Sequence, residues 1–502
     1  MGVLSDRWVS GNPACRTVKQ WAPAKKPGID GAANMPIVEF WIAFVTTVLL
    51  TVGFGVCLIL DKRRSLWVDR RFPGTGRTSV LYGDYNATDR TEHHSHTVQR
   101  LYRLFKARKW PIGGAVLYLT PCVVPTSPEL IEFLLSDEFA KRPTDSVPGG
   151  EEFRRTWNAF EDGQFEALVS VASEESFRLV EEFVHCASTQ PVDVKLLVEQ
   201  YVARVLTRCV FGKMYTERSD NVPISHLLAE RPSGIVWNVL SSACPRAGFT
   251  RVLRRTLMHV QKNHTILEEL VGSLARERTE HVNFLQHLKH AEQRIGQNSR
   301  RKTFADTRTL VLELVRNVFF AASGTMIAAL FEMAQNRAIQ ADLHEVLKAS
   351  GDSMVDYLDK VIGETLRKYP PVAEVSFTSA ANNRLPVGDL IVPKHTTVII
   401  PIRALHRDEE LYPDPLRFEP ERTNLRSHAK ETPPFFRPFG FKPLPVGANF
   451  AMLMVRVGLG TIFSKCSVRL TPGSPDALEM CPRQTMPYPR GRVELLISGA
   501  DE

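Results

Sequence analysis

The chain has 502 residues, of which 43% are apolar and 24% charged, so an intrinsically disordered protein is excluded. The net charge of +8 is spread along the chain, and no zinc-finger, helix-turn-helix or RNA-binding motif accompanies it, so nucleic acid is not an expected partner. The eight cysteines are scattered without C-x-x-C pairs, which indicates a reduced environment without a disulfide framework.

The first informative segment is apolar. Residues 1–34 form a polar extension with no evident function, and residues 40–60 then run for 21 positions without a charge. As a helix this run would be about 31 Å long, enough to cross one bilayer. It is longer than a cleaved signal sequence and stops abruptly at a basic cluster, so residues 35–61 are expected to be a retained membrane anchor. More basic residues follow the run than precede it, which predicts that the body of the protein faces the cytosol.

The remainder reads as one large domain. Residues 62–76 are basic and contain Pro and Gly, which is typical of a hinge, and residues 77–502 form the body. His93, His94 and His96 lie together in a polar segment, and a metal site is not expected there. We predict a strand pair over 110–124, helices over 128–369, a strand over 396–402 and a last helix over 447–464. The fold class is therefore mostly α with a minor β component.

Three later segments carry the most specific information. The first is ETLRKYPP at 364–371, where Glu364 and Arg367 share one helix face before a double proline ends the helix. Alone, this pair would be read as a surface ion pair. It is followed by ALHRDEELYPDPLRFEPER at 404–422 and by PFGFKPLPVGANFA at 438–451. In this order and at this spacing, the three segments resemble the carboxy-terminal third of a cytochrome P450, most closely the microsomal insect type.

The resemblance implies a cytochrome P450 fold with one N-terminal transmembrane helix, a haem cofactor and oxidation of apolar small molecules. It also implies a cytochrome P450 reductase as partner and a place in the endoplasmic reticulum membrane. Glu364, Arg367 and Arg422 match the family's structural triad of charges. His406, Phe418 and Phe439 also fall on family positions.

The chain departs from the family at the haem ligand. Family members bind iron through a cysteine two residues before a glycine, and here that glycine is Gly447, so Pro445 occupies the axial position. Proline has no side-chain donor, and no metal ligand is therefore expected. The loop is also one residue short, and Leu444 replaces its arginine. Cys466 lies too far along the chain to substitute.

Other positions of the vestigial haem pocket change as well. Arg154, Phe439 and Gly447 keep their family identities, whereas Trp157 and Phe377 stand where the resemblance implies arginines. With Leu444, three cationic contacts to the haem propionates are missing, worth about 1.5 to 3 kcal/mol each.

The oxygen-activating helix is also altered. The resemblance implies an acid followed by an alcohol, which deliver protons to oxygen. Thr325 keeps the alcohol, and Gly324 replaces the acid. His406 and Met452 are expected to be core residues rather than iron ligands.

Three functions remain open. The first is a membrane protein of monooxygenase lineage that is impaired or inactive. The second is an active haem-thiolate monooxygenase whose recorded sequence is damaged, for example at exon boundaries. The third alternative is a haem-free protein that binds an apolar ligand or the reductase. The sequence does not identify a substrate.

Overall fold

A computed structural model of the chain describes residues 35–69, 72–75, 83–84, 93–117, 120–135, 150–186, 190–212, 283–288, 304–349, 352–379, 381–387, 390–394, 396–422, 435–440, 444–482, 484 and 486–500. The predicted extension 1–34 lies outside these residues. Of the predicted hinge 62–76, residues 62–69 continue the preceding helix, residues 72–75 are not helical, and residues 70–71 and 76 lie outside the described residues. The chain divides into two compact units, Met1–Asp61 and Lys62–Glu502.

The apolar segment forms helix α1 (Met35–Asp69). Its stretch Trp41–Leu58 has a mean hydropathy of 2.2, and none of it is buried within the protein. The hydroxyls of Thr46, Thr47 and Thr51 donate to carbonyl oxygens one turn earlier, which satisfies these polar groups without water. Length, composition and exposure make α1 a candidate membrane anchor.

A second helix has a comparable apolar content but a different environment. Helix α12 (Phe304–Gln335) contains the stretch Leu310–Gln335, of which 83% is buried inside the protein. A helix that is apolar on all sides and covered by other elements is a core helix.

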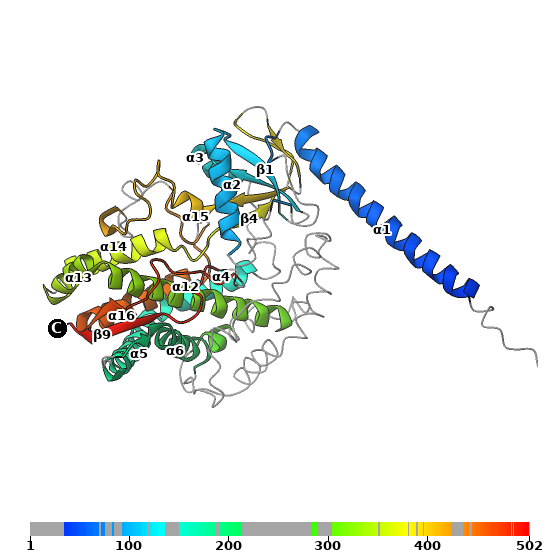
Figure 1. The fold of residues 1–502 in the computed structure, drawn as a ribbon. Coiled ribbons are helices and arrows are strands. Elements are labelled where there is room, and N and C mark those ends of the chain that lie inside the picture. Colours follow the sequence, from blue (N-terminus) through cyan, green and yellow to red (C-terminus); the bar gives the residue numbers. More distant parts are fainter. Residues whose placement is uncertain are drawn as a thin grey trace, which may run out of the picture. The chain divides into compact units, whose positions relative to one another are not determined.

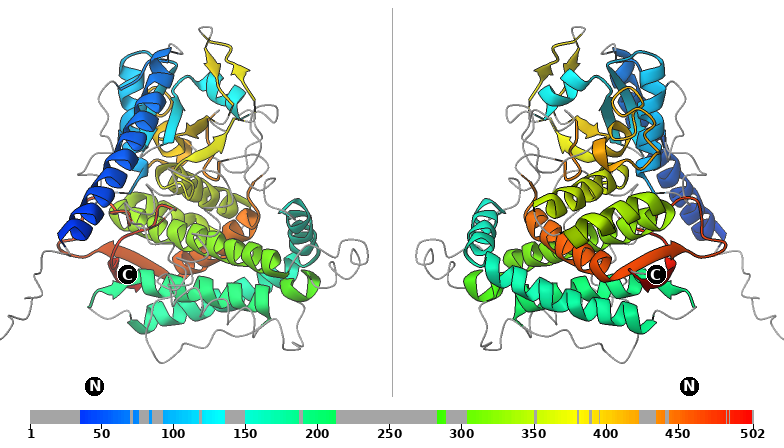
Figure 2. Two further views of the ribbon diagram at one scale, coloured as in Figure 1. Left: turned by 90° about the vertical axis from the view of Figure 1, so that its right-hand side faces the viewer. Right: turned by 90° about the vertical axis from the view of Figure 1, so that its left-hand side faces the viewer.

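The helical part of the larger unit is built around α12. The helices that contact it directly are α4 (Gly150–Gly163), α6 (Val194–Leu206), α13 (Arg337–Ala349), α14 (Asp352–Lys368) and α16 (Ala448–Lys465). Helix α5 (Phe165–Cys186) packs on α6 and α16. In the views of Figure 2, α12 runs between α14 and the α5–α6 pair.

The main sheet lies at another end of this unit, next to α2 (Ser95–Ala107) and α3 (Pro128–Leu134) (Figure 1). Its strand order is β1 (Ile112–Leu117), β2 (Thr120–Pro125), β7 (Thr397–Ile400), β4 (Val375–Thr378). β1 pairs antiparallel with β2, β2 runs parallel to β7 in the register Cys122↔Thr397, and β4 pairs antiparallel with β7. The predicted strand pair over 110–124 is confirmed.

The predicted strand over 396–402 was wrong at its end. β7 stops at Ile400, and a short helix α15 (Ile402–Leu405) begins directly after Pro401. Proline lacks the N–H that a ladder needs, and its fixed φ suits the residue before a helix.

Smaller elements complete the described part of the chain. A second sheet has the order β3 (Val192–Asp193), β9 (Glu494–Gly499), β8 (Cys466–Leu470), and β5 (Asn383–Arg384) pairs with β6 (Ile391–Val392). A π-helical turn η3 (Thr207–Phe211) follows α6, and a 3-10 turn η4 (Pro420–Arg422) follows α15. Long helices with small sheets confirm the predicted fold class.

Candidate functional site

The candidate site centres on the loop before α16, which we call the ligand loop and which is described at residues 435–440 and 444–447. Pro445, at the predicted axial position, is exposed to solvent. Its carbonyl oxygen accepts a hydrogen bond from the N–H of Ala448 at 3.1 Å. Gly447 follows with a φ of +82°, a conformation that glycine adopts without strain. The loop thus closes in a tight turn and presents an aliphatic ring to solvent.

Gly447 lies directly against α12. A Cβ atom built on Gly447 would be 2.4 Å from Cγ2 of Val318 and 2.7 Å from Cδ1 of Leu314. Both distances are too short for carbon atoms, so any side chain at 447 would force these two residues to move. The first turn of α16 and the middle of α12 are therefore in van der Waals contact at this point.

Trp157 on α4 has an aromatic environment instead of an ionic one. Its ring centroid lies 4.8 Å from Phe284, 5.7 Å from Phe160 and 5.8 Å from Phe450, and its side chain is fully buried. The indole Nε1 donates to Glu161 at 3.1 Å, so its polar atom is satisfied. The position at which the resemblance implies a propionate-binding arginine is thus part of the apolar core.

The two other replaced positions differ from each other. Phe377 in β4 is buried and packs in the core beside the main sheet, where it pairs in register with Val398. Leu444 in the ligand loop is 44% exposed. Neither position supplies a positive charge.

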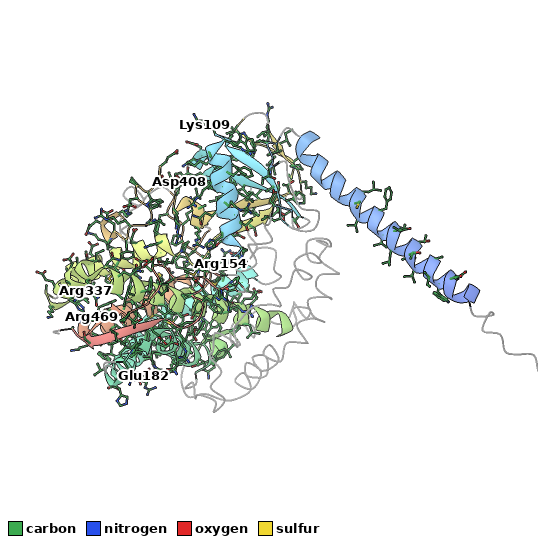
Figure 3. All side chains as sticks on the ribbon, in the orientation of Figure 1. Lys109, Arg154, Glu182, Arg337, Asp408 and Arg469 are labelled. Atoms are coloured by element: carbon green, nitrogen blue, oxygen red, sulfur yellow. The ribbon has the colours of Figure 1, made fainter. Side chains whose placement is uncertain are left out.

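Arg154 is the one cation that the sequence retains in this set. It projects from α4 (Figure 3) and forms an ion pair with Glu151 one turn earlier. A carboxylate of the same helix therefore already occupies its guanidinium.

On α12, Thr325 is buried, whereas Gly324, at the position of the replaced acid, is half-buried. The hydroxyl of Thr325 donates to the carbonyl oxygen of Ala321 at 2.7 Å, so its proton is used within the helix. Gly324 faces Tyr488, whose Cδ2 would lie 3.4 Å from a Cβ at 324. Tyr488 belongs to the segment before β9, so this side of α12 is covered by the carboxy-terminal part of the chain.

A buried polar network, which the sequence did not predict, lies beside Gly324. The hydroxyl of Tyr488 donates to Glu199 Oε1 at 2.8 Å, and Ser323 Oγ lies 3.2 Å from the same tyrosine hydroxyl. Lys195 Nζ lies 4.9 Å from the tyrosine ring and 3.9 Å from Glu199 Oε1. Burial, followed by the charge of Glu199, raises the pKa of Tyr488 well above its ordinary value. No local motif marks these residues, because Tyr488 is 289 positions from Glu199 and 165 from Ser323.

The structure brings the three predicted triad charges together. Arg367 binds Glu364 through two hydrogen bonds of 2.8 Å, and both side chains are fully buried. Nε of Arg422 lies 3.4 Å from Glu364 Oε1, and the N–H of Glu419 donates to the same oxygen at 3.1 Å. Burial raises the pKa of Glu364, and its bonds to Arg367 oppose that rise. Arg367 also donates to the carbonyl oxygens of His406 and Pro415, which ties α14 to the segment after α15.

His406 is a core residue with both ring nitrogens occupied. Nδ1 lies 3.2 Å from the carbonyl oxygen of Arg367, and the N–H of Arg437 donates to Nε2 at 3.0 Å. The ring stacks on Phe436 at 5.5 Å. Burial and the neighbouring Arg367 lower the pKa of His406 to about 3, so the imidazole is neutral and protonated on Nδ1. Binding iron would require it to give up one of these hydrogen bonds.

The other residues considered as ligands are also in the core. Met452 is buried within α16, and Cys466 is buried at the far end of that helix. The 18 residues of α16 separate Cys466 from the ligand loop by about 27 Å. Phe418 and Phe439 are buried in the same apolar cluster as Trp157 and Phe450.

A haem-thiolate centre does not fit these residues. Such a centre needs a sulfur ligand, a flat apolar slot and cations for two carboxylates. Among the described residues of the site, the axial position carries no donor, and Gly447 contacts α12 without an intervening layer. Trp157 places an aromatic ring where the resemblance implies a cation.

Comparisons with known proteins agree with the fold described above. The family model described as Cytochrome P450 matches residues 152–494. The chain is 26% identical to probable cytochrome P450 6a18 of Drosophila melanogaster, over 89% of this chain and 96% of that protein. It is 21% identical to cytochrome P450 6B7 of Helicoverpa armigera, over 91% of this chain and 98% of that protein. A shorter match, 37% identical over 28% of this chain and 31% of the relative, is to probable cytochrome P450 6a13 of Drosophila melanogaster.

The matched region includes most of α4, together with α12, the triad and the ligand loop, and the relatives are of monooxygenase lineage. The chain therefore belongs to the cytochrome P450 family and is similar to its insect members.

Proposed function

We propose that this protein is a membrane-anchored member of the cytochrome P450 family that has lost the haem-thiolate centre and does not catalyse monooxygenation. The observation that carries the proposal is Pro445, an exposed residue without a donor atom at the axial position. In this family the axial thiolate favours cleavage of the oxygen–oxygen bond. Without a thiolate that step has no basis in this chain.

The surroundings of Pro445 support the same conclusion. Trp157 and Phe377 are buried in apolar clusters and Leu444 is exposed, so none of the three replaced positions offers a charge to a propionate. The hydroxyl of Thr325 is hydrogen-bonded within α12, and Gly324 has no acid to donate a proton. Restoring the axial cysteine alone would leave Trp157, Phe377, Leu444 and Gly324 unchanged.

The location follows from α1 and from the family. We expect the protein to be held in the endoplasmic reticulum membrane by a single pass, with the body in the cytosol. A retained contact with cytochrome P450 reductase and the binding of an apolar small molecule are expectations from family membership.

Two alternative functions lead to different observations. An active monooxygenase whose recorded sequence is damaged would explain several short departures together, and resequencing the transcript around codons 320–330 and 438–450 would reveal the missing residues. A haem-free protein that binds an apolar ligand or the reductase would copurify with that partner although it lacks haem.

The test of the proposal is haem content. The full-length protein, expressed with excess haem precursor and purified in detergent, should contain far less than one haem per chain. A stoichiometric, tightly held haem would contradict the proposal. A related insect cytochrome P450 with its axial cysteine, purified in parallel, shows that the procedure retains haem.

A further inference from the structure

We propose that α4, α12 and α16 pack directly on one another where a member of this family holds haem, so that the chain reaches its native fold without a cofactor. The inference rests on the proposed loss of the haem-thiolate centre and goes beyond it, since a chain that lacks the ligand could still need haem to complete its core.

The first support is the contact between α12 and α16. Gly447 approaches Val318 and Leu314 so closely that a single added carbon would overlap both. A second close approach occurs eleven residues further along α16, where a Cβ on Gly458 would lie 2.5 Å from the terminal methyl of Met326. The two helices therefore touch at both points, and the glycines allow that approach.

The second support is the aromatic cluster between α4 and α16. Trp157 on α4 meets Phe450, in the first turn of α16, at 5.8 Å between ring centroids, and Phe284 packs on the indole at 4.8 Å. Phe153 and Phe160 of α4 extend the cluster, each at 5.5 Å from Phe284. An arginine at 157 would place a charge in this cluster, whereas tryptophan adds a large apolar area to it.

The third support is burial by protein atoms alone. Val318, Ala322 and Thr325 on α12 are at most 2% exposed, and Trp157 and Phe450 are fully buried. Side chains that lined an open slot of haem size would expose surface to it. These do not, so the apolar contacts that haem would supply are made by the chain itself.

The first experiment compares the full-length protein made with and without haem synthesis in the host. Anything that binds the folded state stabilises it by mass action. We expect equal yields, the same limited-proteolysis pattern and melting temperatures within about 1 °C of each other, with no shift on addition of hemin. A protein that is protease-sensitive without haem, or melts several degrees higher with it, would overturn the inference.

The second experiment tests the helix contact through a double-mutant cycle. Gly447→Ala should lower the melting temperature more than Gly473→Ala, because Gly473 has a comparable φ of +90° but nothing within 4 Å of its Cβ position. Adding Val318→Ala should recover part of the Gly447→Ala loss, because it removes the nearest overlapping methyl. Strictly additive effects of the two changes would show that the contact does not exist. If Gly447→Ala does not fold, the first experiment, with and without haem, still tests the inference.

The two proposals fail in different ways. A melting temperature raised by haem in a protein that shows no thiolate-type spectrum would refute the closed core and leave the loss of the thiolate intact. A stoichiometric haem-thiolate spectrum would refute both.

Discussion

Removing the negative charge of Glu364 should be among the most damaging single changes in this protein. Both partners of the Glu364–Arg367 pair are fully buried, and Arg422 lies 3.4 Å from the same carboxylate. In Glu364→Gln, Arg367 loses its counter-ion, and an amide NH₂ would face either a guanidinium N–H or the N–H of Glu419. Breaking a buried pair in this way costs about 3–5 kcal/mol. Folded domains are stable by only about 5–15 kcal/mol, so a large part of the total is lost.

The assay is urea unfolding of the purified full-length protein, followed by tryptophan fluorescence. Glu410→Gln is the matched control, because Glu410 pairs with Lys106 at 3.0 Å but is 79% exposed. An exposed pair contributes about 0–1 kcal/mol. The buried triad does not stabilise the fold as argued if the unfolding free energy of Glu364→Gln falls no further than that of Glu410→Gln. The same conclusion follows if the two variants give equal yields of folded protein.

Pro445→Cys supplies a thiolate but should not restore stoichiometric haem, because Trp157, Phe377 and Leu444 still offer no cations; stable haem incorporation in this single variant would contradict that. Burial and Arg367 lower the pKa of His406 from 6.5 to about 3, so between these values only the unfolded chain binds the proton. Stability should therefore fall as pH drops from about 6.5 towards 3, by about 1.4 kcal/mol per pH unit from this group. In urea unfolding, the stability of His406→Gln should depend less steeply on pH than that of the unaltered protein. An equal dependence would show that His406 does not cause this loss of stability. In intact microsomes a carboxy-terminal tag should be digested by added protease, and a tag that survives would reverse the predicted orientation.

Helices were the part of the fold most accessible from sequence. The last helix was predicted over 447–464 and is observed over Ala448–Lys465, because a Pro-rich loop precedes it and an apolar run fills it. The strand pair over 110–124 was recognisable from β-branched residues, and α14 from the double proline that follows it.

Pairings between distant segments were not accessible in the same way. The parallel contact of β2 with β7 joins Cys122 to Thr397, and periodicity within either strand does not specify its partner. The tyrosine network at Tyr488 and the approach of Gly447 to Val318 likewise depend on tertiary packing. Motif order and spacing identified the family positions, but only the structure places Trp157 within an aromatic cluster.

The loss of the axial thiolate is tested most directly by the absorption spectrum of the reduced, carbon monoxide-treated protein, measured on microsomes that express this sequence unchanged. The characteristic band of a thiolate-ligated haem requires a sulfur opposite the bound gas, and Pro445 provides none. We therefore expect no such band, with any copurifying haem substoichiometric and giving a different spectrum. A full thiolate-type band from this unaltered chain would contradict the assignment of Pro445 to the axial position and would make the protein an ordinary haem-thiolate monooxygenase.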